Sequence, residues 1–203
     1  ALIIHKALVA YEFCSPSPYL TGVRVMMGTH EWYVINLYLP SRGDARRAAL
    51  GAVREAVRAV FARDGSARLL LLGDWNTDKE GLARLLRRWR QPLSVVKCCG
   101  NSATFRGTRT WTSIDHMVVS SEARTLMLGA KVNRSWDLSD HWPLEGRIRV
   151  LGLPPTEEVA GTTVQRLDKA LLQEKREDIL SHTIWDALAV DEDIEGLSDW
   201  FES

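Results

Sequence analysis

Several common sequence features are scarce or absent in this chain of 203 residues. It has three cysteines, Cys14, Cys98 and Cys99, and an odd number with an adjacent pair is a poor framework for disulfides. None of the three has the spacing of a zinc site. The sequence therefore predicts a reducing compartment, either the cytoplasm or the nucleus.

Long hydrophobic runs are absent as well. No apolar segment approaches the ~20 residues that span a bilayer, so we expect no membrane partner. The chain opens with ALIIHKAL (1–8), which has neither an initiator Met nor the charged start of a secretory signal peptide. The hydrophobic content of 45% and the charged content of 26% are typical of a globular protein with a substantial core.

The formal net charge of zero conceals an uneven distribution. Residues 1–150 hold 22 Lys and Arg against 13 Asp and Glu, whereas residues 151–203 hold 4 against 13. The first segment is basic enough to favour a polyanionic partner, and the second is an acidic tail. Two solvated surfaces without any partner would show the same totals, so charge alone leaves both interpretations open.

The hydrophobic pattern predicts an α+β domain over residues 1–150, followed by a linker and an acidic helical tail over residues 151–203. Residues 21–39 alternate apolar and polar side chains around a turn, which indicates a β-hairpin. Apolar residues at helical spacing follow Asp44, the expected N-cap of the first helix. RLLLLGD (68–74) is apolar almost throughout, which predicts a strand buried on both faces.

A second helix is predicted to begin near Thr77 or Asp78 and to run through GLARLLRRW, residues 81–89. It carries a local basic patch made of Arg84, Arg87, Arg88 and Arg90. After this helix the pattern is mostly that of β-strands until the linker.

Three polar clusters interrupt the apolar segments: GDWN (73–76), SIDH (113–116) and SDHWP (139–143). Each puts an acid at or near the end of an apolar run. A buried strand does not need a carboxylate and an amide at its end. Hydrolysis of a phosphate ester, however, needs groups of these kinds. That reaction needs a carboxylate to orient or deprotonate water, a neutral group to aim the water, and positive charge for the transition state.

Each cluster taken singly also has a purely structural interpretation. Asp74 could cap a helix, Asp115 could lie in a surface turn, and SDH could be a loop that ends at Pro143. Tryptophans beside such motifs are more often core residues than platforms for base stacking. The order and spacing of the clusters together favour the catalytic interpretation.

The motifs resemble those of the endonuclease/exonuclease/phosphatase superfamily, which includes apurinic endonucleases, inositol polyphosphate phosphatases, deadenylases and retrotransposon endonucleases. VINLYLPSRG (34–43) is similar to its strand that ends in an aromatic residue and a proline. LLLLGDWN (69–76) resembles its GDxN motif, TSIDHMVVS (112–120) its SxIDH strand and LSDHWPL (138–144) its SDHxP motif. The resemblance implies a four-layered α/β-sandwich, in which two packed mixed β-sheets are flanked by helices.

The resemblance also implies catalytic roles. Asp74 would orient and deprotonate the attacking water, and Asn76 would help to place it. Asp115 would hold His141, which would stabilise the charge that develops on the phosphate. Tyr38 would face the scissile phosphate or the leaving group.

Further residues would bind the substrate and a metal. Ser113 and Ser139 would be supporting hydrogen-bond donors, and Thr104 matches a Thr-Phe element near the phosphate in relatives. Asp140 would lie at the metal, which the resemblance implies to be Mg²⁺ or Mn²⁺. His116 would point to the opposite face of its strand from Asp115, so we do not expect it to be catalytic.

One part of the family pattern has no counterpart here. The family begins with a strand carrying an Asn, then a helix, then a strand ending in a Glu that is the principal Mg²⁺ ligand. The opening ALIIHKAL resembles the strand that follows these elements, which implies an N-terminally truncated domain. Glu12 and Glu31 lie in the wrong places to replace the missing Glu.

Within the superfamily, the chain looks like the endonuclease part of a non-LTR retrotransposon polyprotein. Three features carry this likeness: the basic first segment, the short loop before SxIDH and the acidic tail. The resemblance implies that the chain nicks target DNA and leaves a 3′-hydroxyl primer. Its partners would be DNA and the reverse transcriptase portion of the same polyprotein. Two alternatives stay open: an apurinic-site repair endonuclease or phosphatase, and a catalytically inactive remnant that binds nucleic acid or protein.

Overall fold

The computed structural model describes residues 8–12, 17–100, 102–108, 110–135 and 139–150. The predicted tail, residues 151–203, lies outside this range. Among the described residues, no helix is long and apolar enough to cross a membrane. The elements, in chain order, are β1 (Ala10–Glu12), β2 (Leu20–Met27), β3 (His30–Tyr38), α1 (Gly43–Arg63), β4 (Arg68–Asp74), α2 (Lys79–Trp89), β5 (Leu93–Val95), β6 (Cys98–Cys99), β7 (Phe105–Arg106), β8 (Trp111–Thr112), β9 (Asp115–Ser120), α3 (Ser121–Arg124), β10 (Met127–Val132) and β11 (Leu144–Ile148).

The predicted hairpin is confirmed as β2 and β3, which pair antiparallel from Leu20 with Leu37 to Met27 with His30. It belongs to a six-stranded mixed sheet in the order β1-β2-β3-β4-β9-β5. β3 and β4 run parallel, which requires a long crossover connection, and α1 supplies it. β9 then pairs antiparallel with β4, so β3 and β4 end where β9 begins.

The two predicted helices are present, with one correction. Asp78 is the N-cap of α2, and its carboxylate accepts a hydrogen bond from the backbone N–H of Gly81 at 2.6 Å. The prediction that Asp44 caps α1 is wrong, because the N-cap is Arg42 and Asp44 lies inside the first turn. An acidic side chain is still favourable there, since the first turn carries the positive end of the helix dipole.

The residues of β4 divide between two hydrophobic cores, as the apolar run predicts. Leu69 and Leu71 are fully buried in a core with α1 and α2. Leu70 and the partly buried Leu72 face a second core, which includes Ala130 of β10. β10 belongs to a three-stranded sheet in the order β11-β10-β6.

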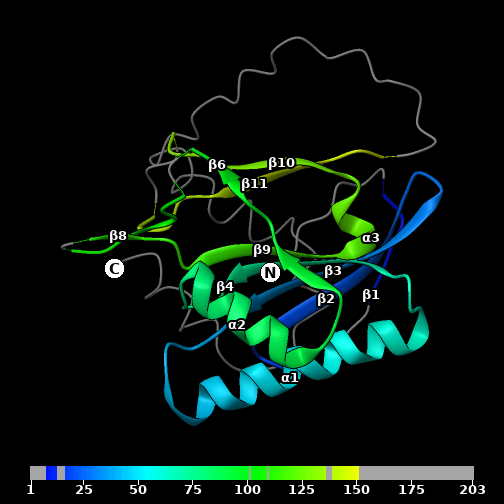
Figure 1. Ribbon diagram of the computed structural model, residues 1–203, viewed down its shortest axis with the longest axis horizontal. Helices are drawn as coiled ribbons and strands as arrows, with labels where there is room; N and C mark the ends of the chain where they lie inside the picture. The colour runs from blue at the N-terminus through cyan, green and yellow to red at the C-terminus, as the bar shows by residue number, and fades with distance from the viewer. Residues whose placement is uncertain (1–7, 13–16, 101, 109, 136–138, 151–203) are drawn as a thin grey trace, which may run out of the picture. The chain divides into compact units, whose positions relative to one another are not determined.

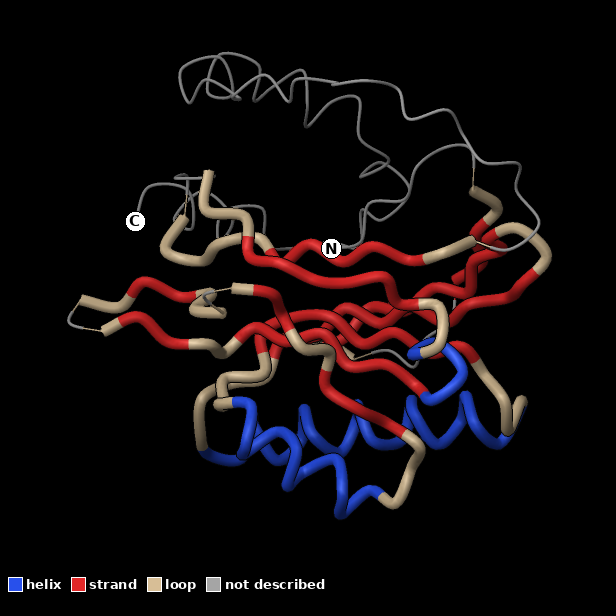
Figure 2. The backbone as a smooth tube through the Cα atoms, turned by 45° about the horizontal axis from the view of Figure 1, so that its top comes forward, coloured by secondary structure: helices blue, strands red, loops and turns tan. Residues whose placement is uncertain are grey.

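The described residues therefore form successive layers of helices, the six-stranded sheet and the three-stranded sheet. Figure 1 shows α1 and α2 on the side of the large sheet opposite β10 and β11, and Figure 2 shows the same order from another direction. This confirms an α+β fold built on two packed mixed sheets with helices, and of the four predicted layers the described residues form these three. A small antiparallel ribbon, β7 and β8, extends from these layers.

Candidate active site

Three of the predicted site residues lie at the ends of adjacent strands. Tyr38 at the end of β3 is in register with Asp74 at the end of β4, and Asp74 is in register with Asp115 at the start of β9. Side chains in register on neighbouring strands point to the same face of a sheet. Leu70 lies four residues before Asp74, and Met117 lies two residues after Asp115, so each shares a strand face with that acid. Both pack in the core between the sheets. The three polar residues therefore lie on the face that meets the smaller sheet.

Asp74 and Asn76 form a closed local pair. The backbone N–H of Asn76 donates to Asp74 Oδ1 at 2.8 Å, and Asn76 Nδ2 donates to Asp74 Oδ2 at 3.0 Å. The same Nδ2 also donates to the carbonyl of Leu39 at 2.8 Å. Between the two residues, the fully buried Trp75 donates from Nε1 to the carbonyl of His116 at 3.1 Å. The Trp75 anchor and the side-chain bonds hold the carboxylate in one orientation.

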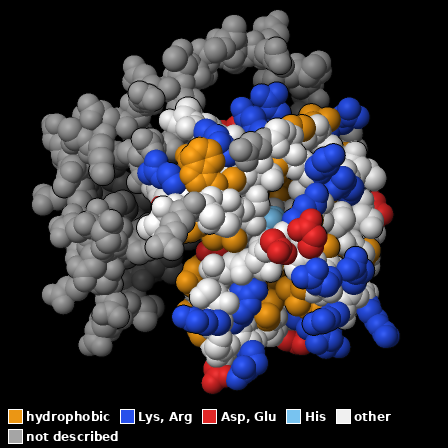
Figure 3. Space-filling view, turned by 60° about the vertical axis from the view of Figure 1, so that its left-hand side comes forward, with side chains coloured by type: hydrophobic (Ala, Val, Ile, Leu, Met, Phe, Trp, Pro, Cys, Tyr) orange, Lys and Arg blue, Asp and Glu red, His pale blue; other side chains and the backbone are white. Residues whose placement is uncertain are grey.

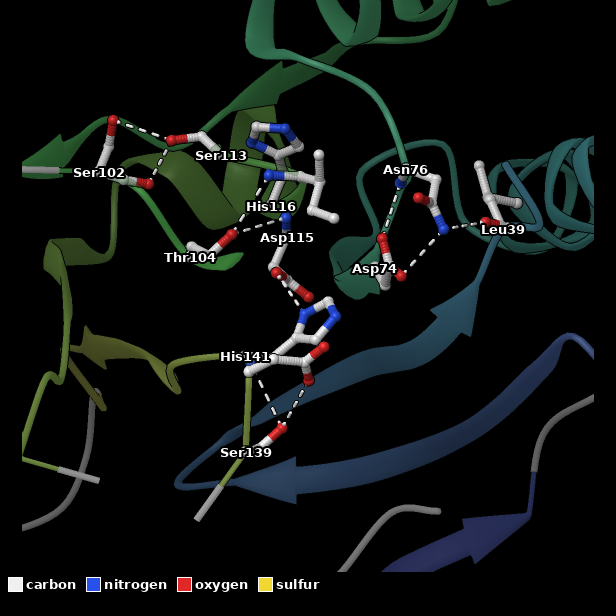
Figure 4. Close-up of polar contacts among 12 residues, drawn as sticks. Leu39, Asp74, Asn76, Ser102, Thr104, Ser113, Asp115, His116, Ser139 and His141 are labelled. Atoms are coloured by element: carbon white, nitrogen blue, oxygen red, sulfur yellow. Dashed lines mark hydrogen bonds and ion pairs between the residues drawn. The ribbon is translucent and has the colours of Figure 1, made fainter. Parts of the chain in front are cut away.

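Asp115 and His141 form a second pair, although 26 residues separate them in the sequence. His141 Nδ1 lies 2.9 Å from Asp115 Oδ2. A carboxylate only accepts hydrogen bonds, so Nδ1 carries the proton and Nε2 is the nitrogen left for a substrate. The ring of Phe105 packs against the imidazole with 4.8 Å between centroids. In Figure 4 the Asp115–His141 pair lies next to the Asp74–Asn76 pair.

The electrostatics of the two pairs differ in a useful way. The hydrogen bond to Asp115 raises the pKa of His141 against the opposing effect of burial, and the charge of Asp74 adds to the increase. Burial raises the pKa of the Asp74 carboxyl, although the N–H of Asn76 acts in the opposite direction. His141 thus keeps its second proton to a higher pH than a free imidazole, and Asp74 is a stronger base than an exposed aspartate.

Thr104 is predicted to contact the phosphate, and the structure shows a supporting position for it. Its side chain is 1% exposed, and its hydroxyl accepts the backbone N–H groups of Ile114 at 3.2 Å and Asp115 at 3.0 Å. Its carbonyl accepts the backbone N–H of Trp142 at 2.7 Å. Thr104 therefore connects the start of β9 to the segment that carries His141, and its contact with a phosphate stays a prediction.

The two predicted serine donors also hold local structure. Ser113 Oγ donates to the carbonyl of Ser102, as Figure 4 shows. Ser139 Oγ accepts the backbone N–H of His141 at 3.1 Å and donates to Asp140 Oδ1 at 3.2 Å. Ser139 thus fixes the turn from which His141 extends.

The predicted metal ligand, Asp140, is exposed, and its backbone carbonyl accepts from the N–H of Arg106 at 2.7 Å. Within the described part of the chain, no group of three or more His, Cys, Asp and Glu side chains could hold a metal ion. The donors present are single carboxylates, and Mg²⁺ commonly binds one or two carboxylates and completes its shell with water and substrate phosphate. The chemistry of these donors fits Mg²⁺, but the described residues do not form a closed cage.

His116 is separated from the site, as expected. It is in register with Gly73 and therefore faces the opposite side of the sheet from Asp115. It is buried, and its Nε2 lies 2.8 Å from the carbonyl of Thr77. Burial lowers its pKa, so it is a neutral structural histidine.

Sequence reasoning missed Arg46, an α1 residue whose guanidinium lies beneath the site. Arg46 Nη1 donates to the carbonyl of Pro40 at 2.8 Å and to that of Trp75 at 3.2 Å. It thereby joins Pro40, two residues after Tyr38, to Trp75, the residue before Asn76. In the sequence it is one arginine among several on a polar helix face, so no local signal identifies it.

Comparison with known proteins gives a fold but no sequence relative. No family model matches the sequence, and no curated protein matches it. Among solved structures, the endonuclease domain of TRAS1, a telomere-specific non-LTR retrotransposon, superposes with a TM-score of 0.56 and 19% identity over 70% of this chain and 68% of that one. The 3′ phosphatase NExo from Neisseria, bound to a product DNA hairpin, gives 0.54 and 18% over 69% and 70%.

The chain has an endonuclease/exonuclease/phosphatase-like fold. A mannosyl-6-phosphatase from Bacteroides thetaiotaomicron shares this fold with a TM-score of 0.50 and 21% identity, over 64% of this chain and 56% of that one. The structural neighbours thus include an endonuclease domain, a 3′ phosphatase bound to DNA and a mannosyl-6-phosphatase. At such identities the likeness extends to the fold, and the substrate has to be argued from this chain's own residues.

Proposed function

We propose that the chain is a phosphodiester hydrolase that nicks DNA and leaves a 3′-hydroxyl. The observation that carries the proposal is the position of the Asp74–Asn76 pair beside the Asp115–His141 pair at one end of the sheet. Together they supply a fixed carboxylate base, a neutral amide and a cation, which are the groups that phosphate-ester hydrolysis needs.

In the proposed reaction, Asp74 takes one proton from a water molecule as the water oxygen bonds to phosphorus. Asn76 aims that water with its amide, and the Nε2–H of His141 donates to a non-bridging phosphate oxygen that gains charge. The bond from phosphorus to the 3′ oxygen breaks. We assign the exposed hydroxyl of Tyr38 to the leaving 3′ oxygen, to which it gives a proton that it regains from solvent.

We propose Mg²⁺, or Mn²⁺ in its place, as the cofactor, with Asp140 as its protein ligand. When bound, the ion would screen the negative charge of the phosphate. A polyanionic partner also suits the face shown in Figure 3, which carries many Lys and Arg side chains.

An exposed aromatic cluster near His141 supports a nucleic acid as the substrate. Trp111 is 56% exposed and packs edge-on against Trp142 with 5.3 Å between centroids. The guanidinium of Arg134 lies 4.9 Å from the centre of the Trp111 ring and 4.8 Å from that of Trp142. An exposed indole beside an arginine is a suitable surface for stacking bases and contacting phosphates. A small sugar phosphate would make no use of it.

The wider setting follows from the same proposal. The fold shared with a retrotransposon endonuclease domain supports an origin of this chain beside a reverse transcriptase, which would use the 3′-hydroxyl as a primer. We propose DNA and that reverse transcriptase as its partners, inside the cell, where such a polyprotein would act.

Nicking of supercoiled plasmid tests the proposal. The wild-type chain, Asp74→Ala and Trp111→Ala would be incubated in Mg²⁺ and in EDTA, and the new ends tested for extension by a DNA polymerase. We expect nicks that a DNA polymerase extends, that need Mg²⁺ and that disappear in Asp74→Ala, since a lost base costs about 100- to 10,000-fold in rate.

Binding of DNA without nicking would identify an inactive nucleic-acid-binding protein. Nicking confined to duplexes with an abasic site would identify a repair enzyme, and either result would overturn the proposal.

A further inference from the structure

The solvent face of α2 carries three arginines, and its C-cap is a fourth; none of them plays a part in the site described above. Arg84, Arg87, Arg88 and Arg90 are all exposed, and they line one open hollow of about 500 Å³. The opposite face of the helix, with Leu82 and Leu86, is buried in the core. The buried apolar face therefore holds the helix in place, and the arginine side chains extend from this fixed backbone into solvent.

Unlike two exposed arginines of α1, these arginines form no ion pair with a described residue, although Glu80 lies four residues before Arg84. On α1, Arg47 pairs with Asp44 and Arg58 pairs with Glu55. Within the described residues, none of these four arginines takes part in an ion pair. Between Gly81 and Gln91 the sequence contains no acid at all. Like charges three and four residues apart on a helix repel each other, so an anion from outside would stabilise this surface.

The position of the helix connects this surface to the site. The N-cap of α2, Asp78, comes two residues after Asn76, and the helix starts beside the end of β4 (Figure 1). At ~1.5 Å of rise per residue, Arg84 lies about 9 Å and Arg88 about 15 Å along the helix from Asp78. A duplex whose scissile phosphate lies at Asp74 reaches that distance within a few base pairs.

We propose that Arg84, Arg87, Arg88 and Arg90 form a second contact surface for nucleic acid, which binds backbone phosphates of the duplex flanking the nicked site. The inference rests on the proposed function for the identity of the anion, since DNA supplies the repeated phosphates that four guanidinium groups fit. Arginine is suited to this contact because its planar guanidinium binds a phosphate with two parallel hydrogen bonds. Such contacts give affinity and orientation without reading the base sequence.

The test is the salt dependence of binding, measured by fluorescence anisotropy in EDTA so that nothing is cleaved. The probes are a labelled 30-base-pair duplex and labelled poly-L-glutamate of similar charge. The variant Arg84→Gln/Arg87→Gln/Arg88→Gln keeps Arg90, whose φ of 54° favours few residues. The matched control, Arg47→Gln/Arg54→Gln/Arg58→Gln, removes the same charge from exposed positions of α1. Circular dichroism melts of all chains verify that they fold.

Each phosphate contact contributes about 0.9 to the slope of log affinity against log salt. We expect the α2 variant to lower that slope by about 2 to 3, and the α1 control to leave it at the wild-type value. Equal loss in both variants would show that only net charge matters, and would overturn the inference. Loss of binding to poly-L-glutamate as large as the loss to DNA would assign the surface to an acidic protein and overturn it too.

The outcome is separable from that of the proposed function. A chain that does not nick plasmid but loses DNA binding in the α2 variant would refute the hydrolase and keep the contact surface. A chain that nicks plasmid normally, and whose α2 variant keeps the wild-type salt slope, would keep the hydrolase and refute the contact surface.

Discussion

At the scale of single residues, the pairing of Asp115 with His141 makes the clearest prediction. Their hydrogen bond is the largest cause of the raised pKa of His141. Asp115→Asn is therefore expected to lower that pKa, whereas Asp140→Asn, whose charge makes the smallest contribution named, is expected to lower it less. NMR titration of the imidazole C–H signals measures both. Equal decreases in the two variants would contradict the assignment of Asp115 as the partner.

The same pair gives a pH dependence of stability with a defined sign. A histidine whose pKa is raised by folding contributes stability that is fully present below its unfolded pKa, near 6.5, and lost as the pH rises through the raised value. Urea denaturation should therefore show a greater difference between wild type and Asp115→Asn at pH 6 than above the raised pKa. A difference that grows with rising pH would have the wrong sign.

At the scale of elements, Gly73 determines how closely β3 and β4 approach at the site. Its φ is 136°, and a Cβ there would lie 1.9 Å from the carbonyl oxygen of Leu37. Gly73→Ala is expected to cost at least about 3 kcal/mol, because strain and a backbone clash add together. Gly51→Ala, on α1 with nothing within 4 Å, should instead be neutral or stabilising by up to about 1 kcal/mol. Thermal or urea unfolding of both variants tests this, and similar stabilities would contradict the structure.

At the scale of the whole molecule, the core between the sheets sets the distance from Asp115 to His141. Met117, 4% exposed, lies against Gly146 of β11, just after the segment with His141. Met117→Ala is expected to cost about 2 to 5 kcal/mol and also to lower the pKa of His141 by loosening the pair. Leu69→Ala, in the core with the helices, should cost a similar free energy and leave that pKa unchanged. Urea denaturation with imidazole NMR distinguishes the two cores, and an equal pKa change in both variants would contradict this division.

Much of this organisation was predictable from the sequence because it depends on local patterns. The two-residue alternation of residues 21–39 and the continuous apolar run of 68–74 specify their strands directly. The motif order in turn gave the fold, which the comparison of structures confirms. The N-cap of α1 was the local error, since Asp44 is a good cap by type and the helix begins one residue before it.

The sequence by itself determined which chemical groups this protein holds: a carboxylate and an amide after a buried strand, an acid opening another strand, and a histidine before Pro143. Only the tertiary structure decided which of them meet. The pairing of β4 with β9 brings Asp74 beside Asp115, and the packing of two sheets brings His141 to 2.9 Å from that acid. It also gave Thr104 and Arg46 their supporting contacts, because hydrogen bonds between residues 11 and 29 positions apart leave no mark on a local pattern.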